Sequence, residues 1–176
     1  MRSTGSIIMS IFGAIWWIVG GASSDWSIVP AYVLPVLVTF ALVILSLRMR
    51  VAPESITEDQ RKRRGRIVGI ASGVEGLVIF VVVNILSNTG AQAWTAPAIA
   101  IVVGLHFLPL ARWLPARLYY ATSGALVIIG LVGICVSDPL LRIQLVCPSA
   151  ACVLWLTSVL VLRTQPKTEV SIGHGA

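Results

Sequence analysis

Six apolar segments of similar length divide the chain, with short polar segments between them. They cover residues 6–22, 29–47, 67–87, 94–111, 116–136 and 140–162. Each is close to the ~20 residues that a helix needs to cross ~30 Å of hydrocarbon. The pattern predicts a single all-helical membrane domain, residues 1–176, whose six transmembrane helices form three antiparallel hairpins. Three spans precede the middle of the chain and three follow it, as in inverted-repeat transporters, but the two halves show no convincing residue-level similarity.

The first apolar segment also has features of a cleavable signal. Arg2 provides a positive residue before the segment, and the small residues 20–23 resemble a cleavage site. However, the apolar run 6–20 is as long as or longer than the apolar part of most signal peptides, and it contains Trp16 and Trp17. These features favour a retained helix. Cleavage would leave the orientation of the other five spans unchanged.

The composition agrees with a membrane protein. Hydrophobic residues make up 57% and charged residues 11% of the chain, against about 25% charged residues in soluble domains. A net charge of +6 would suggest nucleic acid in a soluble protein, but beside a membrane such charges set topology and meet anionic lipid. We therefore expect no nucleic-acid partner. The longest connection, residues 48–66, is too short for a separate soluble catalytic domain.

The basic residues are distributed asymmetrically about the six spans. Of the 13 Lys and Arg residues, all except Arg142 lie on one side when the connecting segments are assigned alternately to the two sides. The positive-inside rule makes that side cytoplasmic, so both termini are expected in the cytoplasm. The expected location is the cell (cytoplasmic or inner) membrane, crossed several times.

Arg142 is the exception, and Asp138 is its expected partner. Asp138 lies four residues earlier, on the same face of the predicted sixth helix, so the two side chains can form an ion pair at the outer interface. Asp138 is also a favourable N-cap, and Pro139 suits the first helical position. The pair would explain how one positive charge is tolerated on the outer side.

The cytoplasmic loop 48–66 has an acidic first half and a basic second half. Its basic residues are Arg61, Lys62, Arg63, Arg64 and Arg66. Residues 55–64 are expected to form a short helix on the lipid headgroups, with Pro53 near its start. The cluster is interpreted first as an orientation signal that contacts anionic lipid. The alternative is a surface that senses phospholipid or docks a partner.

Two ionisable residues, Glu75 and His106, lie clearly within spans, where such groups are costly and are functional candidates. Glu75 is ~12 Å from the cytoplasmic end of the third span, and His106 is ~8 Å from that of the fourth. The turn at residues 88–93 has the same midpoint in the sequence as Glu75 and His106. An antiparallel pair of helices therefore places both residues at one depth. Whether they face each other depends on helix rotation, which the sequence leaves open.

Two interpretations of this pair compete. In the first, Glu75 and His106 are a buried polar contact between helices, worth roughly 1 kcal/mol in a membrane. In the second, they are a proton-responsive or solute site, because two neighbouring ionisable groups titrate as a coupled unit. Absence of any contact is the third outcome. Asn84, further along the third span, is a candidate to continue a polar track, with interhelical hydrogen bonding as its alternative.

Small and kink-forming residues surround these candidates. Gly104 and Pro109 flank His106, and Pro109 can free carbonyl groups near the cytoplasmic end of its span. The sixth span contains the candidate polar residue Gln144, followed by Cys147 and Pro148. A Cys-Pro pair in a membrane helix also occurs in heavy-metal pumps, but Cys147 has no second thiol on its face. A helix kink with a packed thiol is therefore favoured over a metal site.

A short element in the fourth span resembles a known kind of protein. The residues Gly104, His106 and Pro109 form a Gly-x-His-x-x-Pro pattern, followed by a short basic turn and a further span. This pattern, with the chain length and the hydrophobic hairpins, is similar to small bacterial six-span membrane proteins of unknown function. The resemblance implies a bacterial cytoplasmic-membrane protein and no particular activity. It does not extend to Glu75 or Cys147.

These features lead to a ranked set of functions. The first is a small permease or channel for a small solute or proton, lined by spans three, four and six. The second is an accessory or scaffold protein that docks a partner or anionic lipid through the basic loop. A lipid-modifying enzyme ranks last, because no phosphate loop, dinucleotide fingerprint, HExxH or pair of carboxylates at catalytic spacing is present. No cofactor or metal is expected. Six short spans make a thin bundle, which favours a homo-oligomer.

Overall fold

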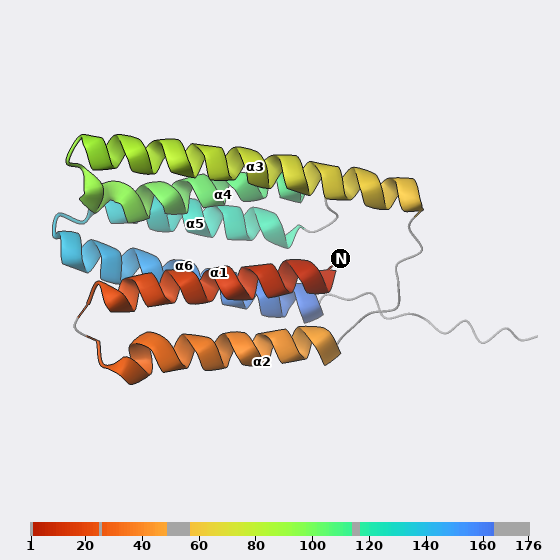
Figure 1. Ribbon diagram of the computed structural model, residues 1–176, viewed down its shortest axis with the longest axis horizontal. Coiled ribbons are helices and arrows are strands. Elements are labelled where there is room, and N and C mark those ends of the chain that lie inside the picture. Colours follow the sequence, from red (N-terminus) through yellow and green to blue (C-terminus); the bar gives the residue numbers. More distant parts are fainter. Residues whose placement is uncertain (1, 25, 49–56, 114–116, 164–176) are drawn as a thin grey trace, which may run out of the picture.

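The chain forms long helices that lie side by side. The computed structural model describes residues 2–24, 26–48, 57–113 and 117–163. Successive helices return toward the end of the bundle at which the preceding helix began (Figure 1). The helices are α1 (Arg2–Ala22), α2 (Leu34–Arg48), α3 (Glu58–Asn88), α4 (Thr95–Trp113), α5 (Leu118–Cys135) and α6 (Pro139–Arg163). A π-helical turn (Val29–Val33) precedes α2, and a 3-10 turn, η2 (Gln92–Trp94), precedes α4.

Six helical segments are long and apolar enough to cross a membrane, as the hydrophobic pattern predicted. The chain is thus an all-helical protein with the character of a multi-pass membrane protein. Many large apolar side chains face outward, as expected where lipid rather than water is the solvent. They include Phe12, Ile28, Leu37, Phe40, Leu77, Phe80, Ile128 and Leu156.

The core runs along α1, α4, α5 and α6, while α2 and α3 lie at opposite edges of the bundle (Figure 1). The most extensive contacts join α4 to α5 and α1 to α6. Leu126 of α5 and Val146 of α6 are fully buried. By contrast, no residue of the apolar window of α3 is buried. The third helix therefore contributes little to the core and contacts mainly α4 and the turn before it.

Glycines permit the closest approach between α4 and α5. A Cβ atom added to Gly104 would lie 2.9 Å from the backbone nitrogen of Val127. On the facing helix, a Cβ atom added to Gly130 would lie 2.7 Å from the carbonyl oxygen of Pro97. Small residues at such positions let membrane helices approach closely. Gly104 therefore serves the packing of α4 against α5.

Buried hydroxyl groups join α1, α2 and α6. The Oγ atom of Ser6 lies 3.1 Å from that of Ser46 and 2.5 Å from that of Ser158, and the Oγ atoms of Ser10 and Ser158 are 2.9 Å apart. All four side chains are fully buried. Interhelical hydrogen bonds of this kind stabilise helix association in membranes. Sequence reasoning overlooked this cluster, although the spacing of Ser6 and Ser10 places both on one face of α1.

The predicted separate helix in the basic loop is wrong. Thr57 caps α3 through a reciprocal capping box with Gln60, and from Glu58 the helix continues without interruption to Asn88. The basic residues therefore lie on the first turns of a helix that reaches beyond its neighbours (Figure 1). Residues 49–56, including the start of the predicted helix, lie outside the described part of the chain.

The predicted ion pair between Asp138 and Arg142 is also wrong. The Asp138 carboxylate accepts hydrogen bonds from the backbone N–H groups of Leu140 and Leu141, so it acts as the N-cap of α6. Arg142, one turn later, is only 2% exposed and turns into the bundle. No ion pair joins Asp138 to Arg142 among the described residues. The N-cap prediction for Asp138 is confirmed.

Arg142 instead binds backbone carbonyl oxygens. Its Nε atom donates to Gly133 and Val136 at 3.1 Å, Nη2 donates to Val136 at 2.6 Å, and Nη1 donates to Ala93 at 3.0 Å. The guanidinium carbon also lies 3.7 Å from the centre of the Trp94 ring. Arginine near a helix C-terminus binds the last free carbonyls and interacts favourably with the negative end of the helix dipole. One side chain thus joins the ends of α5, η2 and α6.

Candidate functional site

The turn between α3 and α4 sets the alignment of the two helices. Thr89 ends α3 with its N–H bonded to the Ile85 carbonyl, and Gly90 has a φ of +72°, which suits glycine. The chain then reverses through Gln92–Trp94 into α4. Because the turn is short, residues at equal distances from it lie at similar depth in the helix pair.

Glu75 and His106 meet across this helix pair. Oε2 of Glu75 lies 3.5 Å from Nδ1 of His106, and the two side chains are 19% and 10% exposed. Ala71, one turn before Glu75 on α3, lines the same groove as the imidazole. The contact that the sequence register made possible is therefore present in the structure. This contact joins α3 and α4 at one depth.

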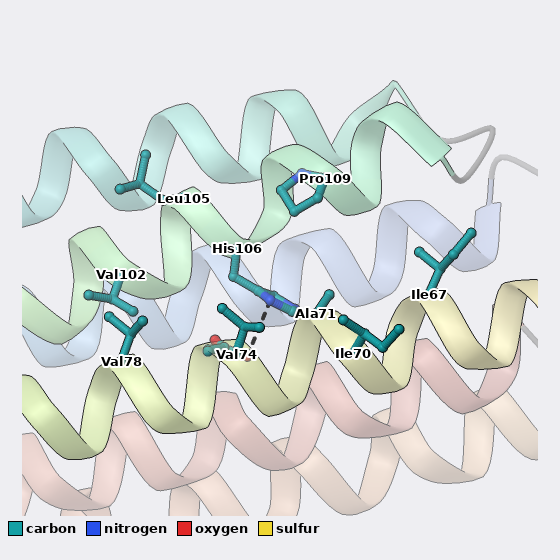
Figure 2. A pocket seen from close by; sticks show the side chains of 10 residues that line it. Ile67, Ile70, Ala71, Val74, Val78, Val102, Leu105, His106 and Pro109 are labelled. Atoms are coloured by element: carbon teal, nitrogen blue, oxygen red, sulfur yellow. Dashed lines mark ion pairs between the residues drawn. The ribbon is translucent and has the colours of Figure 1, made fainter.

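An apolar groove of about 490 Å³ surrounds the pair between α3 and α4. Figure 2 shows His106 reaching from α4 toward α3, with a dashed line marking its contact with the Glu75 carboxylate. The groove is lined by Ile67, Ile70, Ala71, Val74, Glu75, Val78, Val102, Leu105, His106 and Pro109. Its volume falls in the ~300–1,000 Å³ range of ligand pockets. Glu75 and His106 are its polar groups.

The groove lies on the outside of the bundle. Ile70 and Val74 on α3 are more than half exposed, and Leu105 on α4 is 49% exposed. In a membrane-embedded bundle, this face meets lipid rather than bulk water. The Glu75–His106 pair is thus placed where a carboxyl and an imidazole can share a proton or bind a polar group in apolar surroundings.

Several candidates from the sequence lie away from this groove. Asn84 is exposed, and its side-chain nitrogen donates to the Phe80 carbonyl of its own helix at 2.8 Å. Gln144 is on α6, which does not line the groove. The predicted extension through Asn84 and a lining role for the sixth span are therefore not present in the described residues. Pro109 does line the groove, whereas Gly104 faces α5.

The Cys147–Pro148 pair lies where α6 crosses α1. Cys147 is fully buried, and a Cβ atom added to Gly20 would lie 2.9 Å from its Cβ atom and 3.2 Å from Cδ of Pro148. Cys147 is a free thiol, and so are Cys135 and Cys152, which are both exposed. No group of three or more possible metal-binding side chains is found among the described residues. These contacts give the pair a packing role between two helices.

The basic residues that were predicted to lie in the loop 48–66 lie on the first turns of α3. Lys62 forms an exposed ion pair with Glu58, with Nζ and Oε1 2.9 Å apart. Arg63 and Arg66 are exposed, and neither has an acidic partner among the described residues. The side chains of Arg61 and Arg64 lie outside the described part of the structure.

No protein-family model matches this chain, and neither a curated protein nor a solved structure is similar enough to count as a match. The resemblance based on Gly104, His106 and Pro109 therefore stays a prediction.

Proposed function

We propose that this chain is a bacterial inner-membrane protein that conducts a small solute or protons, with Glu75 and His106 as its binding groups. The observation that carries the proposal is the 3.5 Å contact between these two side chains, inside helices of membrane-spanning length. Ionisable residues at such positions are costly to keep, and they commonly mark ion or proton pathways. A carboxyl beside an imidazole can accept, hold and release a proton.

The topology proposed with this function has six spans in three hairpins and both termini in the cytoplasm. It is supported by the basic residues at helix ends: Arg48 ends α2, Arg63 and Arg66 lie near the start of α3, Arg112 lies near the end of α4, and Arg163 ends α6. These helix ends lie at one end of the bundle (Figure 1). In this orientation, the Glu75–His106 pair lies in the cytoplasmic half of the membrane. Homo-oligomer formation is part of the proposal, since α3 and α4 form a peripheral rather than a central groove.

Proton flux in proteoliposomes tests this function. The wild-type protein should dissipate an imposed pH gradient, and Glu75→Gln should lower the rate to that of protein-free vesicles, because the amide cannot exchange a proton. Asn84→Ala is the matched control on the same helix, since the Asn84 side chain donates to the Phe80 carbonyl of α3 and lies outside the groove. Its rate should equal that of the wild type. Absence of flux in the wild type, or equal flux in Glu75→Gln, would contradict a proton-conducting role.

The contact itself gives a separate prediction about stability. The Glu75→Gln and His106→Ala substitutions should show an interaction energy of about 1 kcal/mol in a double-mutant cycle. The measurement is the free energy of unfolding of the wild type, the two single variants and the double variant in one detergent. Strictly additive effects would show that the two side chains do not interact in the detergent-solubilised protein.

A second function is supported by the extension of α3. The exposed Arg63 and Arg66 lie near the start of α3. The start of α3 reaches beyond the neighbouring helices, and an accessory protein would dock an acidic partner there (Figure 1). The two functions predict opposite outcomes in cells. In the accessory role, neutralising the basic residues abolishes function and Glu75→Gln has little effect. In the transport role, Glu75→Gln is the damaging change.

A further inference from the structure

We infer that the groove between α3 and α4 is a binding site for one anionic phospholipid. In this arrangement, an acyl chain lies along the groove and the headgroup phosphate binds arginines at its end. The inference does not depend on transport, because it concerns what occupies the groove in the membrane. Three features carry it: the apolar lining of the groove, its length, and the positive charge at one end.

The lining of the groove suits a hydrocarbon chain. Apart from Glu75 and His106, its walls are Ile, Val, Leu, Ala and Pro side chains. Several of them are well exposed on the outer surface of the bundle, including Ile70, Val74 and Leu105. A chain of the surrounding bilayer therefore reaches the groove from the side, without passing through the protein.

The length of the groove matches one leaflet. On α3 the lining runs from Ile67 to Val78, which is about 16 Å at 1.5 Å per residue. The hydrocarbon core of a bilayer is ~30 Å thick, so one leaflet accounts for about half of it. On α4 the same groove runs from Val102 to Pro109. The groove thus extends from one membrane surface to the middle of the bilayer, as an acyl chain does.

Positive charge marks the end of the groove at that surface. Arg63 lies one turn before Ile67 and Arg66 one turn before Ile70, so both arginines continue the groove-lining face of α3. Arg112 lies three residues after Pro109 and continues the lining face of α4 in the same way. All three side chains are exposed, and none has an acidic partner among the described residues.

These arginines favour a phosphate over other groups. The guanidinium presents paired N–H donors that match phosphate oxygens, and each cation near an anionic membrane surface adds to the attraction. The acidic residues of this region lie farther from the groove: Glu58 is paired with Lys62, and Asp59 lies one turn before Arg63. Glu75 is nine residues beyond Arg66, ~13 Å along the helix. The mouth of the groove is thus complementary to an anionic headgroup.

A bound acyl chain would also change the surroundings of Glu75 and His106. Both side chains retain some exposure in the groove, 19% and 10%. A chain along Ile70, Val74 and Leu105 would exclude water from their contact. Because a hydrogen bond is stronger in less polar surroundings, the bound chain would strengthen the contact between Glu75 and His106.

Native mass spectrometry of the full-length protein in a mild non-ionic detergent tests the inference. The probes are phosphatidylglycerol and phosphatidylcholine with identical acyl chains. We expect one phosphatidylglycerol molecule to bind more tightly than phosphatidylcholine. Neutralising Arg63, Arg66 and Arg112 together to Gln should weaken phosphatidylglycerol binding about 100-fold, with about fivefold for each single change.

The matched control neutralises Arg48, Arg117 and Arg163 to Gln. These residues lie at the same end of the bundle and carry the same total charge, but they belong to α2, to the start of α5 and to α6, which do not line the groove. This variant should bind phosphatidylglycerol within about threefold of the wild type, because no more than general electrostatic attraction is lost. Equal losses in the two triple variants would overturn the inference, as would equal affinity of the wild type for the two lipids.

Filling the groove gives an independent test. Val74→Phe places a larger side chain on an exposed wall of the groove, and Leu77→Phe makes the same kind of change on an exposed part of α3 outside it. Val74→Phe should lower phosphatidylglycerol affinity at least about tenfold and Leu77→Phe should not. If Val74→Phe instead disrupts a dimer and leaves lipid binding unchanged, the groove is occupied by a second copy and the lipid site is refuted.

Discussion

Replacing Arg142 with Gln is expected to lower the free energy of unfolding by about 3 kcal/mol. The arginine is 2% exposed and donates to carbonyl oxygens of Gly133, Val136 and Ala93, so the change removes hydrogen bonds that join three segments. The freed carbonyls at the end of α5 would remain partly shielded from water. Unfolding of purified protein in detergent, followed by circular dichroism, measures the loss.

Two further variants separate the contributions at this position. Arg163→Gln is the control, because Arg163 is an exposed arginine at the other end of the same helix, and it should change stability by less than about 0.5 kcal/mol. Trp94→Leu removes the ring that lies 3.7 Å from the guanidinium and should reduce stability by about 1 kcal/mol. If Arg142→Gln unfolds at the wild-type temperature, the carbonyl contacts do not stabilise the protein.

Replacing Gly130 with Ala should be the second large loss, about 2 kcal/mol relative to the same change at Gly124. A Cβ atom at Gly130 would lie 2.5 Å from Cγ1 of Ile101 and 2.7 Å from the carbonyl oxygen of Pro97. The side chain of Ile101 can rotate, but the Pro97 carbonyl belongs to the backbone of α4. Accommodating the methyl group therefore requires α4 and α5 to move apart.

Gly124 provides a matched control on the same helix. A Cβ atom there would meet nothing within 4 Å, so Gly124→Ala should be neutral or stabilise the helix by up to ~1 kcal/mol. Both variants add only one methyl group, so the difference in unfolding temperature reports the cost of crowding between α4 and α5 at Gly130. Similar temperatures for the two variants would mean that α4 and α5 do not approach as closely as described.

The apolar segments predicted the helices well because the membrane restricts the possible structures. A segment in hydrocarbon must satisfy its backbone hydrogen bonds internally, so a run of ~20 apolar residues has one regular solution, a helix. The relative depth of Glu75 and His106 was predictable for a related reason. A short turn fixes the register of two antiparallel helices, and counting residues from the turn then gives depth.

The orientation of side chains around each helix was less predictable. In lipid, apolar residues occur on both the packed and the exposed faces, so hydrophobicity does not indicate which face meets a neighbour. The path through α3, α4 and α6 was proposed from polar residues alone. In the structure, the groove is formed by α3 and α4, and Gln144 of α6 lies elsewhere.

Arg142 shows how local spacing can suggest the wrong partner. The interval of four residues from Asp138 favours an ion pair on an isolated helix, where exposed side chains meet their nearest neighbours. Here Asp138 binds the start of α6, and the carbonyls of α5 and η2 lie within reach of the guanidinium. These acceptors come from distant parts of the sequence, so only the assembled helix ends reveal them.

The sequence by itself determined six apolar helices, the asymmetric placement of positive charge, and one shared depth for Glu75 and His106. These properties follow from chain length, hydrophobicity and charge, which act along the sequence. Only the tertiary structure decided that Glu75 and His106 face each other, that their groove lies at the edge of the bundle, and that Arg142 binds carbonyl oxygens. Those properties depend on the rotation and packing of each helix, which are fixed by contacts between residues far apart in the chain.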